Sequence, residues 1–528
     1  MRNKFVFLTI IQLLAFLAFV SSCYEDKGNY EYAEIEEAEI DIPEITQSEA
    51  TISYSRFETV RLDPVITNNG KESADEYDYE WSVYPQSPSY DSSLGGYPPA
   101  KVIGNDFQLN YTLEEVPGDY YVVLKATNKT TRSVSSFRFP LVIGTVNGWL
   151  VLEEDADGKG DISAIRDPEI VPGLTESRTG IIKNIFSQNN DGAKFTGAKF
   201  VYWRHVNTTY TNVFVYTSDD SYRLNAGTYL LSSANYQAFF NASLAPSVYQ
   251  PQAIFYESPY SGQNEILINN GNVYSIRWNM MGQRDVFSAP VALSGVTLTV
   301  QPFIAGIPRA TTPTNSTAVL YDDVDFPEGS FVVGDRFVTQ QTSWNRPSVT
   351  SGAFDPTNIN PTADTELKLL YLGTGRDGTT SAIFRDAKAG NKPWLYHGDF
   401  RDFAAPVAIG KYDISRLPEI SAATHFVFGV RGDVLFYASG SNVYSHAFPE
   451  GATNNLLTVG SDETIAQLKL YSHSVNPDNT GRILFVATNS SSGGKVYKVK
   501  FNELTGTIVG TPVTFTGFNK IIDMTIKQ

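Results

Sequence analysis

The sequence predicts an all-β protein in which an amino-terminal β-sandwich precedes a β-propeller of seven blades. Three observations support this fold class. Aromatic residues make up 13% of the 528 residues and charged residues only 18%, a composition typical of pleated, half-buried strands. The 40 glycines and 27 prolines supply many turns. After residue 145, strand-like segments recur at intervals of roughly 40 to 65 residues, as they do in repeat architectures.

Residues 1–22 predict an export signal. Two basic residues precede an apolar run over residues 5–20, which is too short for a spanning helix of roughly 20 residues. The run leads to Cys23, the single cysteine of the chain, and residues 20–23 resemble a bacterial lipobox. That resemblance implies that Cys23 is acylated and anchors the protein to a membrane. The alternative is a secretory peptide with an incidental cysteine.

Residues 23–39 are polar and largely acidic. Such a segment cannot bury enough apolar surface to fold alone, so we expect it to form a tether. Acidic residues just after the cysteine resemble the signal that sends Bacteroidetes lipoproteins to the outer face of the outer membrane, although Tyr24 and Lys27 depart from that pattern. The resemblance implies a lipid-anchored protein exposed at the cell surface.

Residues 40–144 consist of strands and turns. Residues 77–83 alternate apolar and polar side chains with the period of a half-buried strand, and two further strands are expected over 120–126 and 137–143. These segments resemble a PKD-type, immunoglobulin-like sandwich with Trp81 on a central strand. The resemblance implies that Trp81 packs in the core.

Residues 145–528 carry a weak internal repeat. The pair Val-Tyr opens the second strand of three predicted hairpins, at Val273, Val443 and Val496. Apolar strands precede the hairpins, and we count seven of them: 199–203, 253–256, 318–321, 367–372, 425–430, 467–471 and 520–526. Repeats of about 50 residues with several strands each are typical of propeller blades.

The two ends of this region complement each other. A hairpin at 149–154 and 162–165 has no strand before it, and the strand at 520–526 has no hairpin after it. We therefore expect the last strand to pair with the first hairpin and close a ring of seven blades without a long exposed edge. Six or eight blades are the alternatives, because the blade near residues 330–390 is poorly marked.

Composition argues against several classes of function. The net charge of −17 is spread along the chain, and an acidic surface repels phosphate backbones, so we expect no nucleic-acid partner. The five histidines show no zinc-binding spacing, and the chain has no Gly-x-Ser-x-Gly motif. We therefore expect no catalytic residues and no cofactor, apart from the calcium candidate described next.

One acidic cluster imitates a calcium loop. Glu153, Asp155, Asp157 and Asp161 stand at odd-numbered ligand positions around Gly158, but Ala164 stands where the loop needs its last glutamate. The alternative is an ordinary turn between the two strands of the first hairpin, where Asp and Gly are common.

Aromatic residues in polar surroundings are candidates for ligand binding. Trp344, Trp394 and Tyr396 lie in segments that resemble loops, and an aromatic ring in a polar loop is costly to solvate unless it packs or binds. A carbohydrate ring can stack on such a residue. The alternative is that these rings cap the cores of the blades.

Together, the lipobox, the acidic tether, the PKD-type sandwich and the aromatic repeats resemble the PKD-like family lipoproteins of Bacteroidetes. The resemblance implies a non-catalytic surface component that helps a SusC/SusD-type TonB-dependent uptake system capture a glycan or a peptide. One alternative is a propeller hydrolase or lyase acting on polysaccharide, which needs converging carboxylates or a metal site. The other is an adhesive or structural envelope protein, which needs a large apolar patch.

Overall fold

The computed structural model describes residues 38–528 except 47–51, 90–91, 94–95, 97–98, 206–210, 242, 257–263, 278–284, 309–315, 336–342, 349–351 and 403. The chain divides into two compact units. The smaller comprises residues up to 52, 59–111 and 119–142, and the larger comprises 53–58, 112–118 and 143–528. Both consist mainly of strands, so the predicted all-β fold class is confirmed.

The smaller unit is the immunoglobulin-like β-sandwich. Its longest strands form a sheet in which β10, β9, β6 and β7 follow one another. Trp81 in β6 lies opposite Leu124 in β9. The Trp81 side chain is fully buried, and its Nε1 donates a hydrogen bond to the carbonyl of Asp106 at 3.0 Å, which confirms the predicted core role. The bounds of these strands are β6 (Tyr77–Pro85), β7 (Lys101–Gly104), β9 (Gly118–Asn128) and β10 (Val134–Gly144).

Shorter elements complete the amino-terminal part of the chain. Two further sheets have the orders β1-β4-β5 and β3-β8. The bounds are β1 (Glu39–Asp41), α2 (Pro43–Thr46), β2 (Ile52–Ser55), β3 (Thr59–Leu62), β4 (Val65–Asn68), β5 (Lys71–Glu72), η1 (Ala74–Glu76) and β8 (Leu109–Thr112).

The larger unit is the β-propeller. Its described residues form seven antiparallel sheets of three to five strands and one separate pair of short strands. In chain order the first three sheets comprise β11 (Gly148–Glu154), β12 (Lys159–Arg166), β13 (Gly180–Ile182), β14 (Phe195–Thr196) and β40 (Lys520–Lys527); β15 (Ala198–His205), β16 (Thr211–Thr217), β17 (Ser221–Asn225) and β18 (Leu231–Ala234); and β19 (Pro251–Tyr256), β20 (Asn264–Asn269) and β21 (Asn272–Arg277).

The other four sheets have four strands each. They comprise β24 (Ala305–Gly306), β25 (Ser316–Asp322), β26 (Ser330–Asp335) and β27 (Ser343–Asn345); β28 (Leu367–Thr374), β29 (Thr380–Asp386), β30 (Lys392–Asp399) and β31 (Val407–Asp413); β32 (His425–Phe428), β33 (Val434–Ser439), β34 (Asn442–Ala447) and β35 (Thr453–Thr458); and β36 (Thr464–Leu470), β37 (Ile483–Ser490), β38 (Gly493–Lys500) and β39 (Val513–Phe518). The separate pair is β22 (Ala292–Leu293) and β23 (Val296–Thr297), and the helical turns are η2 (Glu176–Arg178), α3 (Ile185–Asn189), η3 (Tyr236–Phe239), η4 (Arg376–Gly378), η5 (Ala387–Ala389) and η6 (Ile420–Ala422).

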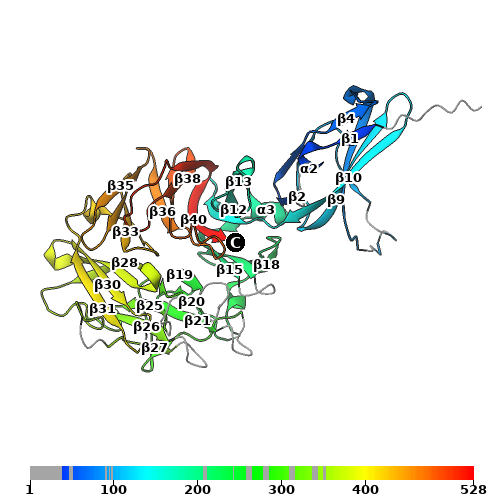
Figure 1. The fold of residues 1–528 in the computed structure, drawn as a ribbon. Coiled ribbons are helices and arrows are strands. Elements are labelled where there is room, and N and C mark those ends of the chain that lie inside the picture. Colours follow the sequence, from blue (N-terminus) through cyan, green and yellow to red (C-terminus); the bar gives the residue numbers. More distant parts are fainter. Residues whose placement is uncertain are drawn as a thin grey trace, which may run out of the picture. The chain divides into compact units, whose positions relative to one another are not determined.

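Apolar cores lie between successive sheets. In β33, for example, Phe436 packs toward the seventh sheet, whereas Leu435 and Tyr437 pack toward the fifth. A strand that is buried on both faces reads as a continuous apolar run, which is why these central strands are recognisable in the sequence. Each sheet shares such a core with the next, and one further core joins the seventh sheet to the first. The sheets therefore follow one another around a ring (Figure 1).

The ring closes through the predicted pairing of its end strands. β40 lies antiparallel to β11, with Trp149 opposite Ile526. Trp149 stacks on Phe485 of the seventh sheet with ring centroids 4.0 Å apart, and its Nε1 lies 3.2 Å from the Met524 sulfur. The same indole thus contacts β37 and β40, so it contributes to the core that joins the last sheet to the first.

The fourth sheet differs from the prediction. The segment at 318–321 was expected to be the first strand of its blade, but it belongs to β25, the second strand. The first strand is β24, which is only two residues long, Ala305 and Gly306. Such a short pairing carries no apolar pattern that a sequence could reveal.

Candidate functional site

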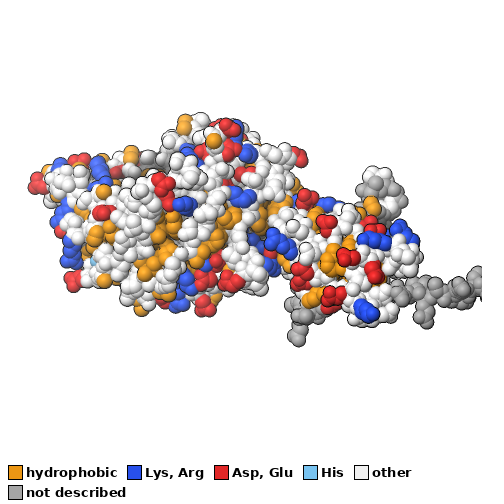
Figure 2. Space-filling model, turned by 90° about the horizontal axis from the view of Figure 1, so that it is seen from above, with side chains coloured by type: hydrophobic (Ala, Val, Ile, Leu, Met, Phe, Trp, Pro, Cys, Tyr) orange, Lys and Arg blue, Asp and Glu red, His pale blue; other side chains and the backbone are white. Residues whose placement is uncertain are grey.

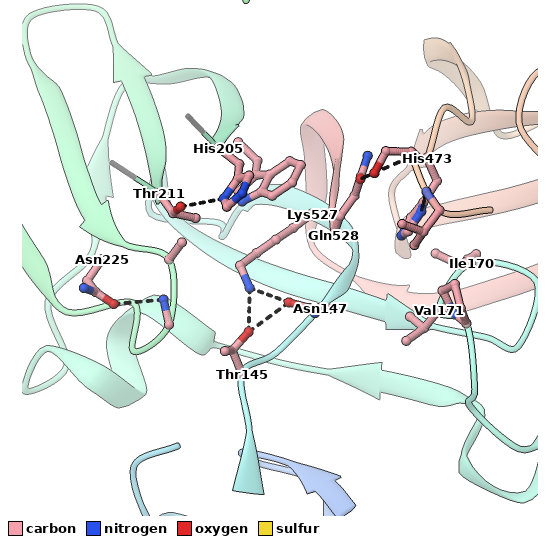
Figure 3. Close-up of a pocket in the computed structure, with 16 residues that line it drawn as sticks. Thr145, Asn147, Ile170, Val171, His205, Thr211, Asn225, His473, Lys527 and Gln528 are labelled. Atoms are coloured by element: carbon pink, nitrogen blue, oxygen red, sulfur yellow. Dashed lines mark hydrogen bonds between the residues drawn. The ribbon is translucent and has the colours of Figure 1, made fainter. Parts of the chain in front are cut away.

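A cavity of about 640 Å³ opens where the first, second and seventh sheets meet. The strands β36, β40 and β15 neighbour one another there. His205 ends β15, Lys527 ends β40, and His473 follows β36, so one residue from each of these strand ends lines the cavity. Functional side chains are commonly held at the ends of rigid strands in this way. Figure 3 shows His205 and His473 on either side of Lys527 in this view.

Lys527 is buried, with 3% of its surface exposed. Its Nζ donates to Thr145 Oγ1 at 2.7 Å, to the Val146 carbonyl at 2.8 Å and to Asn147 Oδ1 at 2.6 Å. The ammonium also lies 5.3 Å from the centre of the Tyr229 ring. All three acceptors are uncharged, and burial lowers the pKa of Lys527 to about 7.

The two histidines have defined hydrogen bonds. The backbone N–H of Val475 donates to His473 Nδ1 at 3.2 Å, so in the neutral ring the proton lies on Nε2. Burial lowers the pKa of His473, which favours this neutral form. His205 Nδ1 lies 2.6 Å from Thr211 Oγ1, and its ring is nearly parallel to that of Trp203.

The rest of the wall is partly apolar. Ile170, Val171 and Pro172 come from the loop after β12, and Val475, which is 63% exposed, comes from the loop after β36. An apolar wall with a few convergent polar groups is the usual composition of a small-molecule site, and the volume falls within the usual range of roughly 300 to 1,000 Å³.

A second cavity, of about 550 Å³, lies among β28, β32 and β36. Its lining is mainly apolar and includes Phe303, Tyr371 and Phe428. Lys469 also lines it, but its Nζ is paired with Asp523 at 2.5 Å and donates to the Met524 carbonyl at 2.6 Å. This cavity therefore offers fewer polar groups to a ligand than the first.

The three predicted aromatic candidates lie elsewhere and not in loops. Trp344 lies in β27 and is 3% exposed, within the core between the third and fourth sheets, and Tyr396 lies in β30 and is 2% exposed, within the core between the fourth and fifth. The expected exposure of these two rings is wrong. Trp344 is a buried ring between polar neighbours along its strand, and Tyr396 lies in a stretch of β30 that is buried on both faces. Trp394, also in β30, is half-buried, and the Nζ atoms of Lys392 and Lys411 lie 4.6 and 4.9 Å from its ring centre.

The structure does not assemble the calcium loop suggested by the spacing of its aspartates. Asp155 and Asp157 lie in the turn between β11 and β12. Asp155 Oδ1 accepts hydrogen bonds from the backbone N–H groups of Asp157 and Lys159 at 3.1 and 2.9 Å, and Oδ2 pairs with Lys194 at 2.7 Å. These are the contacts of an ordinary turn.

Asp161 serves a different purpose. It lies in β12, is 3% exposed, and its Oδ1 accepts the backbone N–H of Phe186 at 3.0 Å at the start of α3. Burial raises the pKa of Asp161. The described part of the chain contains no group of three His, Cys, Asp or Glu residues that could hold a metal ion. Asp155 therefore makes the contacts of a turn and Asp161 those of a buried strand residue.

The predicted lipidation site, Cys23, lies outside the described residues. Among the residues that the structure does describe, no helix has the length and apolar character needed to cross a bilayer.

The sequence analysis missed the residues that line the larger cavity. A search for closely spaced histidines cannot find them, because His205 and His473 are far apart in the chain. A usable signal was present, since His205, His473 and Lys527 each stand one or two residues beyond a predicted first strand, at 199–203, 467–471 and 520–526. In a ring of repeats, such equivalent positions gather at the same end.

Comparisons with known proteins show what this chain is similar to. The chain shows 11% identity to a quinonprotein alcohol dehydrogenase-like protein of Bacteroides thetaiotaomicron, with 90% of this chain and 98% of that chain covered and a TM-score of 0.39. A DUF4784 family protein of Bacteroides caccae is 9% identical, with coverage of 91% and 98% and a TM-score of 0.26. No curated protein sequence matches the chain. The family model of the PKD-like family matches residues 23–198, so the amino-terminal third of the chain is PKD-like, as its residues suggested.

Proposed function

We propose that this protein is a lipid-anchored component of the bacterial cell surface that binds a nutrient, a glycan or a peptide, for a SusC/SusD-type uptake transporter and does so without catalysis. The observation that carries the binding role is the cavity at the ends of β15, β36 and β40, where polar groups converge beside an apolar wall. The PKD-like match supports the family resemblance on which the surface location rests.

The ionisable side chains of the cavity favour binding over hydrolysis. Lys527, His205 and His473 are all basic groups, whereas glycoside hydrolysis ordinarily needs two carboxyl groups on opposite sides of the scissile bond. The cavity is therefore better suited to hold a polar ligand than to hydrolyse a glycosidic bond.

A panel of glycans and peptides tests the binding role. The purified full chain is incubated with each compound, binding is measured by calorimetry, and the recovered compound is analysed by mass spectrometry. We expect at least one compound to bind and to be recovered intact. Recovery of shortened products would show that the protein is an enzyme.

Metabolic labelling with a fatty-acid analogue tests the anchor. We expect label on the wild-type protein and none on the Cys23→Ala variant, which should also leave the membrane fraction. Equal labelling of both proteins would contradict acylation at Cys23. Co-purification with a TonB-dependent transporter from the native membrane tests the partner.

A further inference from the structure

Lys527 lacks an ion-pair partner among the described residues although it is almost fully buried. Its three hydrogen bonds go to a hydroxyl, a carbonyl and an amide oxygen, all uncharged. Burying an ammonium group without an opposite charge is costly, so a counter-charge at this position would be strongly favoured.

Buried lysine and arginine side chains elsewhere in the propeller do have carboxylate partners. Lys498 is 4% exposed and pairs with Asp167 at 2.6 Å and with Glu169 at 2.7 Å. Arg204 is 1% exposed, and its Nη1 lies 3.0 Å from Glu265 Oε2. What sets Lys527 apart from these two is that it lines a cavity large enough for a ligand.

The neighbouring groups in the cavity reinforce this positive character. With the His473 Nδ1 atom accepting from the Val475 backbone, the Nε2–H group is the donor of that ring. His205 is the other ionisable side chain of the lining, so each ionisable side chain there is a base. The chain as a whole carries a net charge of −17, so this cavity departs from the charge of the rest of the protein.

We infer that the cavity binds a ligand that carries a carboxylate group, and that this carboxylate supplies the counter-charge for the buried Lys527 ammonium. The inference rests on the proposed binding function and specifies its ligand. All three ammonium protons of Lys527 are already donated, so Lys527 acts on the anion through its charge and His473 Nε2–H offers a hydrogen bond. Ile170, Val171 and Val475 provide an apolar surface for the uncharged part of the ligand.

Two kinds of nutrient carry such a group. An acidic sugar has a carboxylate on its ring, and a peptide has one at its carboxyl terminus. We therefore use one matched pair of probes for each source: D-glucuronate with D-glucuronamide, and N-acetyl-leucine with N-acetyl-leucinamide. Within each pair the amide keeps the shape and removes the charge.

The first experiment measures the affinity of the wild-type full chain for all four probes by ligand-observed NMR at pH 6.5. We expect the carboxylate of one pair to bind at least tenfold more tightly than its amide, and the pair that shows this identifies the source. Equal affinities within both pairs, or tighter binding of the amides, would overturn the inference.

The second experiment uses variants. Lys527→Met should reduce the preference for the carboxylate over the amide to about one, and His473→Gln should reduce it less. Lys520→Met is the matched control, since Lys520 lies on the same strand but is 63% exposed and pairs with Glu154; it should keep the wild-type preference. An unchanged preference in folded Lys527→Met would contradict the role of Lys527.

The outcomes also separate this inference from the proposed function. If neutral glycans or peptides of the panel bind while the carboxylate probes do not, the inference fails and the binding function stands. If neither the panel nor the probes bind, both fail.

Discussion

Two buried lysines near the closure of the ring differ in what surrounds them. Lys498 in β38 meets the carboxylates of Asp167 and Glu169 in the loop after β12. Lys527 in β40 meets only uncharged oxygens of residues 145–147. Both connect the end of the propeller to its beginning, yet only the first is a complete ion pair. The difference indicates that Lys498 serves the fold, whereas Lys527 leaves a charge that a ligand can use.

The largest effect is expected from Lys498→Met. The substitution leaves the buried Asp167 carboxylate without its lysine, and breaking a buried ion pair costs about 3 kcal/mol or more. Urea denaturation at pH 7 should show this loss in the free energy of unfolding. Adding Asp167→Asn to the same chain should recover part of it, because no buried carboxylate then remains; a double variant that is less stable than the single one would contradict the ion pair.

A pH-dependent effect is expected from Lys527. Burial lowers its pKa from 10.5 to about 7, so between these values the unfolded chain holds a proton that the folded protein has released. Stability therefore rises with pH in this window, by at most about 1.4 kcal/mol per pH unit, and below pH 7 the cost of burying the charge is fully present.

This contribution is isolated by comparing wild type with Lys527→Met in urea denaturation from pH 6 to pH 9. The free-energy difference between the two proteins should shift in favour of wild type by about 2 kcal/mol between pH 7 and pH 9. A difference that stays constant with pH would show that Lys527 does not titrate there.

At pH 7 itself, Lys527→Met should change stability by only about 1 kcal/mol. The substitution leaves three neutral oxygens without their lysine donor, but two of them already share a hydrogen bond, in which Thr145 Oγ1 donates to Asn147 Oδ1 at 2.8 Å. The substitution also removes the cost of a buried charge. Thermal denaturation followed by circular dichroism measures this. A loss as large as that of Lys498→Met would make the two lysines equivalent.

The smallest effect is expected from Lys520→Met. Lys520 is 63% exposed and lies 3.2 Å from Glu154, and exposed ion pairs contribute about 0 to 1 kcal/mol. The same urea series at low and high salt should place this variant within about 0.5 kcal/mol of wild type. A larger change would show that the Lys520–Glu154 ion pair stabilises the pairing of β40 with β11 more than its exposure suggests.

Much of the fold was predictable because central strands buried on both faces carry long apolar runs. The hairpin at 149–165 and the strand at 520–526 were recognisable for this reason, and their pairing followed from the need to remove exposed edges. β24 was not predictable, since two residues carry no pattern. The burial of Trp344 and Tyr396 depends on the neighbouring sheet, which local polarity does not report.

The candidate site was less predictable than the fold. On the face seen in Figure 2, acidic and basic side chains lie interspersed and neither charge dominates, so this view does not mark the site. The sequence around Lys527 does not distinguish it from an exposed charged residue, because its burial depends on the packing of three sheets. Alignment of strand ends across the repeats would have placed His205, His473 and Lys527 together, but not the uncharged oxygens around Lys527.

The pairing of β40 with β11 also sets the order in which the propeller can be completed. Lys520 and its partner Glu154 are 366 residues apart, so in a nascent chain the inner edge of β11 stays unpaired from its own synthesis until the last residues are made. An unpaired edge is a template for association with other chains. Premature termination before residue 520 would leave that edge permanently open, so we expect truncated chains to aggregate.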